Sequence, residues 1–75
     1  MVIQILYFAS LREERQAEEE THTLLQPISI SALFQQIFGR PAEGIRFAIN
    51  QSYVNGDTIL EDGDEVAFLP PLGGG

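Results

Sequence analysis

The sequence predicts an α+β fold in which one main amphipathic helix packs across one face of a mixed β-sheet. Two observations support it: the predicted elements run strand, strand, helix, strand, strand, strand, and the first and last strands are apolar on both faces. Strands of that kind occupy covered, central positions, so we expect these two to lie side by side and parallel in the middle of the sheet. The 75 residues contain no repeat and no linker and predict one domain, 1–75.

The first half of the chain predicts two strands joined by a long connection. A strand is expected over 2–9, which is rich in β-branched and aromatic residues, and a second over 21–25. The charged stretch 11–20 has only Leu11 and Ala17 to anchor a short helix and is interpreted as mostly solvated surface. Alternation divides the first strand into two faces, with Ile3, Ile5 and Tyr7 on one and Gln4, Leu6 and Phe8 on the other.

The clearest helix begins after Ser29, a natural N-cap, and ends at Gly39, a natural C-cap, with Pro41 preventing continuation. Its apolar stripe recurs at i, i+3, i+4 and i+7, as Ile30, Leu33, Phe34 and Ile37. Three strands follow, at 45–50, 53–54 and 65–69, with turns at 55–57 and 61–64. Two prolines end the last strand because neither can donate to a ladder.

The composition excludes several kinds of partner and site. Eleven acidic residues, four arginines and no lysine give a net charge of −7, which argues against a nucleic-acid partner and suits a basic protein surface or simply solubility. Cysteine is absent, which removes disulfides and thiolate chemistry. The N-terminal segment lacks the basic region of a signal peptide and is too short to span a membrane, so a cytoplasmic protein is expected.

Few side chains could carry chemistry. His22 is the only histidine, and its place in a predicted strand favours a surface or edge position over catalysis. The acidic segment 61–65 lacks the ligand spacing of a calcium loop, and its Asp62-Gly63 pair is interpreted as a turn. The glycines at 73–75 precede no helix and so form no phosphate loop. We therefore expect no metal site and no self-contained active site.

The C-terminal tail is the remaining candidate, and its residues are Pro70, Pro71, Leu72, Gly73, Gly74 and Gly75. The prolines favour an extended arm, and the glycines make a slim tip that could thread a narrow channel. The ionised carboxylate of Gly75 is a poor electrophile, so it becomes useful only if another enzyme activates it, for example as an acyl-adenylate formed with ATP. The alternative is a frayed, inert terminus.

A partner that holds this tail needs an anchor elsewhere on the domain. Ordering six tail residues costs roughly 6–12 kcal/mol, and the tail has few apolar atoms to offset that cost. Alternate residues of the first and last strands share the face opposite the helix, namely Leu6, Phe8, Ala67 and Leu69. We expect this face, extended by Leu72, to bind the partner, unless a loop covers it.

Several segments match one known pattern, and they are 7–9, 12–13, 48–51, Val54, 62–68, 70–71 and 74–75. Together they resemble the small subunit of molybdopterin synthase, the MoaD family of ThiS/MoaD-type ubiquitin-like sulfur carriers. The likeness runs from end to end, and its specific part is DGDEVAF, one intervening residue and two prolines, together with a terminal Gly-Gly. The sequence departs from the family at Gly73, where relatives often carry a side chain, and in its short loop 40–44.

The resemblance implies a β-grasp fold and a sulfur-donor role. It implies that an E1-like enzyme adenylates Gly75 with ATP and that a sulfurtransferase or desulfurase supplies sulfur for a thiocarboxylate. The tail would then enter the large synthase subunit and deliver sulfur to cyclic pyranopterin monophosphate for molybdenum cofactor synthesis. The catalytic side chains belong to the large subunit, so this chain would be a non-catalytic donor with no permanently bound cofactor, in a heterotetramer built on a dimer of large subunits.

Three other functions remain open at this point. One is a sulfur carrier for thiamine synthesis similar to ThiS, whose relatives are less similar at the DGDEVAF block. Another is a ubiquitin-like modifier attached through Gly75 to lysines of other proteins. The last is a β-grasp interaction module with an inert tail.

Overall fold

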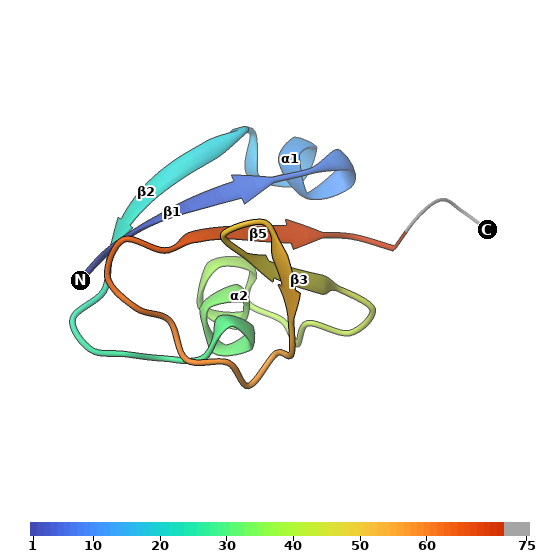
Figure 1. The fold of residues 1–75 in the computed structure, drawn as a ribbon. Helices are drawn as coiled ribbons and strands as arrows, with labels where there is room; N and C mark the ends of the chain where they lie inside the picture. Colours follow the sequence, from blue (N-terminus) through green and yellow to red (C-terminus); the bar gives the residue numbers. More distant parts are fainter. Residues whose placement is uncertain (72–75) are drawn as a thin grey trace.

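The computed structural model describes residues 1–71, which form a five-stranded mixed sheet and two helices (Figure 1). The elements are β1 (Val2–Tyr7), α1 (Ala9–Arg15), β2 (Glu19–Thr23), α2 (Ile30–Phe38), β3 (Arg46–Ile49), β4 (Ser52–Val54) and β5 (Glu65–Leu69). The strands lie in the order β2-β1-β5-β3-β4. Helix α2 covers one face, and the predicted main helix is confirmed. No helix of the described part is long and apolar enough to cross a membrane.

The first and last strands are neighbours in the middle of the sheet, as predicted. β1 and β5 pair in parallel, with Leu6 opposite Ala67 and Tyr7 opposite Phe68, while the other pairs are antiparallel. Side chains pointing toward α2 are almost completely buried, and they include Ile3, Ile5, Tyr7, Val66 and Phe68. β5 is therefore hydrogen-bonded on both edges, and the chain that leaves it starts from the centre of the sheet.

Helix α2 has the caps and the buried stripe that the sequence predicts. The Ser29 side chain accepts a hydrogen bond from the Ala32 amide at 3.1 Å, and Gly39 ends the helix in the left-handed region at φ 71°. The buried residues of the stripe are Ile30, Leu33 and Phe34. Phe34 meets Phe68 of β5 edge to face, with ring centroids 5.3 Å apart, so the helix is packed against the central strand.

Two boundaries in the first half differ from prediction. The first strand ends at Tyr7 rather than residue 9, and a short helix, α1, occupies much of the stretch interpreted as solvated surface. The reason is tertiary: Leu11 is only 2% exposed and joins the core, so one apolar contact holds an otherwise charged helix. The second strand runs 19–23 rather than 21–25, and Leu25 is 99% exposed in the loop beyond it.

The turns around β3, β4 and β5 are fastened by side chains. Asn50 and Gln51, at φ 50° and 72°, form the two-residue turn between β3 and β4. The Asn50 side chain accepts a hydrogen bond from the Glu65 amide at 3.0 Å and donates one to Asp64 at 3.1 Å. One asparagine thus joins the β3–β4 turn to the start of β5.

Candidate functional site

The sheet face opposite α2 presents the four residues predicted to bind a partner. Leu6 and Phe8 from β1 and its end, and Ala67 and Leu69 from β5, line one open hollow of about 230 Å³. They meet because the parallel register puts Leu6 beside Ala67. The prediction that these side chains share one face is confirmed by the geometry, while their role in binding stays a prediction.

The same hollow has further walls that the sequence analysis missed, and they are Ala48, Gln51, Tyr53 and Glu65. Ala48 lies opposite Ala67 on β3, and Tyr53 lies opposite Ala48 on β4. The sequence signal that could have placed Ala48 in this hollow is the alternation along 46–49. It puts the side chains of Arg46 and Ala48 on one face of the sheet and the buried Phe47 on the other. We call Leu6, Phe8, Ala48, Tyr53, Ala67 and Leu69 the apolar face.

The apolar face is open to solvent. Phe8 is 42% exposed and Tyr53 is 64% exposed, so no loop of the described chain covers them. Exposed aromatic side chains gathered on one strand surface are typical of protein interfaces, where such residues contribute most of the binding energy.

The tail begins at one end of this face. Pro70 and Pro71 directly follow β5, with Pro70 half-buried and Pro71 exposed. Pro70 and Leu69 border a second hollow with Arg46 and Tyr53, next to the apolar face. The other predicted tail residues, Leu72, Gly73, Gly74 and Gly75, whose carboxylate is the predicted reactive group, lie outside the described residues.

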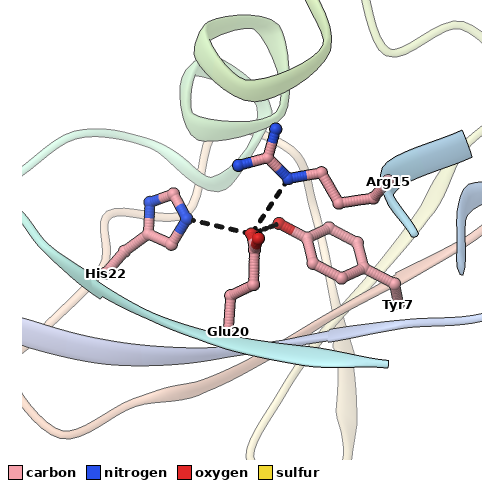
Figure 2. A network of polar contacts seen from close by, with 4 residues as sticks. All are labelled: Tyr7, Arg15, Glu20 and His22. Carbon is pink, nitrogen blue, oxygen red and sulfur yellow. Dashed lines mark hydrogen bonds and ion pairs between the residues drawn. The ribbon is translucent and has the colours of Figure 1, made fainter. Parts of the chain in front are cut away.

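A polar cluster lies on the helix side of β1 and β2 (Figure 2). The Glu20 Oε1 atom accepts hydrogen bonds from the Tyr7 hydroxyl at 2.7 Å and from Arg15 Nε at 3.0 Å, and His22 Nε2 lies 3.2 Å away. Burial opposes ionisation of Glu20, but these hydrogen bonds outweigh it and lower its pKa. Burial and the contact with Glu20 raise the pKa of Tyr7 far above its ordinary value.

This cluster is structural in character. Its four residues come from β1, α1 and β2, so it holds the short helix α1 against the edge of the sheet. Tyr7 points into the core, away from the apolar face, and His22 lies on the edge strand β2, as predicted.

Residues 61–64 form a turn, as predicted, and Glu65 begins β5. Asp62 accepts a hydrogen bond from the Val2 amide at 2.7 Å, and Asp64 accepts one from the Glu61 amide at 2.8 Å. Gly63 takes φ 87°, a conformation that favours glycine. These carboxylates stabilise the backbone, and within residues 1–71 no three acidic or histidine side chains gather as a possible metal site.

Comparison with known proteins agrees with the fold. The ThiS family model matches residues 5–75. The chain is 41% identical over 83 residues to the molybdopterin synthase sulfur carrier subunit of Chlamydomonas reinhardtii, covering 100% of both chains. It is 35% identical over 82 residues to that of Homo sapiens, covering 97% of this chain and 93% of the relative.

Three solved structures share the fold. A putative molybdopterin converting factor subunit 1 from Pyrococcus furiosus has a TM-score of 0.78 at 26% identity, covering 96% of this chain and 99% of the other. Small archaeal modifier protein 1 of H. volcanii has a TM-score of 0.79 at 15% identity, and the match covers 95% of this chain and 98% of the other. A complex of subunits 1 and 2 of molybdopterin-converting factor from Helicobacter pylori has a TM-score of 0.63 at 23% identity, and the match covers 100% of both chains. The predicted ubiquitin-like β-grasp fold is confirmed.

Proposed function

The chain belongs to the ThiS family, and we propose that it is the sulfur carrier subunit of a molybdopterin synthase. The observation that carries this proposal is the 41% identity, over the full length of both chains, to a curated sulfur carrier subunit of that enzyme. The geometry supports it, since the tail leaves the central strand β5 beside an exposed apolar face.

The proposed chemistry takes place at the carboxylate of Gly75. An E1-like enzyme in the cytoplasm transfers AMP from ATP to this carboxylate and releases pyrophosphate. The terminal sulfur of a persulfide on a sulfurtransferase or desulfurase then attacks this acyl-adenylate and displaces AMP. A thiol cleaves the resulting acyl disulfide, which leaves the thiocarboxylate on Gly75 and a disulfide on the sulfur donor. No side chain of this chain acts as acid or base in these steps, and ATP is bound by the activating enzyme.

The second part of the proposal is the partner. The large subunit of the synthase binds the apolar face and receives the tail, so that the thiocarboxylate reaches the pterin precursor in the large subunit's active site. Burying Phe8 and its neighbours offsets the entropy lost by ordering the tail. The Helicobacter pylori complex of subunits 1 and 2 supports a pairing of this kind.

Two alternatives are less well supported. A thiamine-pathway carrier would share the family and the tail chemistry, but the full-length relatives at 34–41% identity are molybdopterin synthase subunits. A protein modifier would share the fold with the archaeal modifier, whose 15% identity supports the fold alone.

The test is a reconstitution in two stages. The protein ending at Gly75 is incubated with ATP, the cognate activating enzyme and a sulfur donor, and its intact mass should rise by the exchange of one oxygen for sulfur. Adding the large subunit and cyclic pyranopterin monophosphate should discharge the thiocarboxylate and form molybdopterin. An unchanged mass would refute the carrier role, and a thiocarboxylate that is not discharged would refute the molybdopterin assignment.

The matched controls act at the tail. Deleting Gly75, or adding one residue after it, should abolish the mass change, because the reacting carboxylate is then misplaced. Both variants should keep the thermal unfolding temperature of the parent, since neither alters residues 1–71. Sulfur transfer by either variant would contradict the proposed mechanism.

A further inference from the structure

The four arginines of this acidic chain are not used alike. Within residues 1–71, Arg12 pairs with Glu18 at 3.6 Å, Arg15 with Glu20 at 3.0 Å, and Arg40 with Glu14 at 2.9 Å. The fourth arginine, Arg46, has no carboxylate of the described chain within ion-pair distance. In a protein with eleven acidic residues, one arginine thus remains available for a carboxylate from outside.

Arg46 is exposed but held in place. Its guanidinium carbon lies 4.2 Å from the centre of the Tyr53 ring, across the diagonal between β3 and β4. A guanidinium stacked on an aromatic face keeps the N–H groups at its edge free to donate two parallel hydrogen bonds to a carboxylate. Because Tyr53 restricts the side chain in advance, less conformational entropy is lost when such a bond forms.

The position of Arg46 connects the apolar face with the tail. Arg46 is the cross-strand partner of Leu69, the last residue of β5, and it points to the same side of the sheet as Ala48. With Tyr53, Leu69 and Pro70 it borders the hollow from which the tail departs. An acidic residue, Glu65, lines the other end of the apolar face, at the start of β5.

From these observations we propose that Arg46, stacked on Tyr53, binds a carboxylate of the synthase large subunit beside the entrance that receives the tail. This inference rests on the proposed function and adds a specificity-determining residue to it. The apolar face can slide or rotate on a partner with little change in buried area, whereas an ion pair at Arg46 selects one orientation. That orientation aims Pro70 and Pro71 at the entrance.

The experiment measures the affinity of the full chain for the purified large subunit by calorimetry, at low and at high salt. Arg46→Glu should weaken binding by tenfold or more at low salt, and the loss should shrink at high salt because the repulsion is screened. Arg46→Lys keeps the positive charge, but an ammonium group neither stacks on the Tyr53 ring as a guanidinium does nor donates two parallel hydrogen bonds to one carboxylate. Binding should therefore weaken several-fold. Tyr53→Leu, which removes the support of the guanidinium, should behave like Arg46→Lys.

Arg40→Glu is the matched control, since it makes the same charge change beside α2, on the other side of the sheet, at a side chain that is 46% exposed. It should bind within about twofold of wild type, and circular dichroism should show all four variants folded. Equal losses for Arg40→Glu and Arg46→Glu, or wild-type affinity for Arg46→Glu, would overturn the proposal.

Two further outcomes separate the possible causes of failure. If wild type does not bind the large subunit at all, the proposed function fails and this inference fails with it. If sedimentation shows that wild type forms a dimer that Arg46→Glu abolishes, the carboxylate belongs to a second copy of this chain and the inference alone is overturned. Recovery of Arg46→Glu binding by a reversed charge at the tail entrance of the large subunit would identify the bound carboxylate and support the proposal.

Discussion

Truncating Phe8 measures how much the apolar face contributes to partner binding. A phenylalanine buries about 200 Å² when fully covered. Because Phe8 is 42% exposed in the free protein, about 85 Å² of its surface remains for a partner to cover. At about 25 cal/mol per Å², covering this surface contributes about 2 kcal/mol, so Phe8→Ala should raise the Kd for the large subunit about 30-fold.

The assay is the same calorimetric titration, with thermal unfolding recorded for each variant. Leu25→Ala is the control, because Leu25 is 99% exposed in the loop after β2, away from the apolar face. It removes apolar surface without touching the proposed interface and should leave the Kd unchanged. A folded Phe8→Ala variant that binds as tightly as wild type would refute the reasoning, and so would an equal loss in Leu25→Ala.

Three further predictions concern the fold that supports this face. Phe68→Ala should lower the free energy of unfolding by about 3–5 kcal/mol in urea titration, because a fully buried ring is lost from the core, and a loss below 1 kcal/mol would contradict the packing. Asn50→Ala should cost about 1–3 kcal/mol, and Asn50→Gly should cost less since glycine accepts φ 50°; the reverse order would contradict the turn geometry. Since its pKa is lowered, Glu20 should stabilise the fold above the ordinary glutamate pKa and lose that effect as the pH falls through the lowered pKa. The melting temperatures of wild type and Glu20→Gln should therefore differ at pH 7 and converge as the solution is acidified; a constant difference would contradict this assignment.

The parts of the fold that local pattern determines were predictable. Helix α2 carries its own signals, from the Ser29 cap to Gly39, and strand alternation correctly separated the two faces of β1 and β5. The stretch that forms α1 was interpreted as mostly solvated surface because only Leu11 and Ala17 could anchor a helix there. The burial of Leu11 is set by tertiary packing rather than by a periodic pattern within 11–20. The ends of β1 and β2 shifted with it, since pairing resumes where that helix ends.

The candidate site was predictable only in part for a related reason. Leu6, Phe8, Ala67 and Leu69 follow from alternation together with a parallel central pair. Tyr53 and Arg46 belong to the site because β3 lies beside β5 and β4 beside β3, and this order is set by long-range pairing rather than by neighbouring residues. The distinction of Arg46 from the other arginines also depends on ion pairs between separate elements.

The pairing of β1 with β5 has a consequence for synthesis of the protein. β1 is synthesised before its central neighbour, β5, which is the last strand of the described chain, with Gln4 opposite Glu65. Contacts so distant in sequence slow folding, and the core cannot close until β5 is available. Fragments that end before β5 should stay unfolded and be degraded. A folded apolar face should therefore be found only on chains that have been translated through β5, to the residue before the tail.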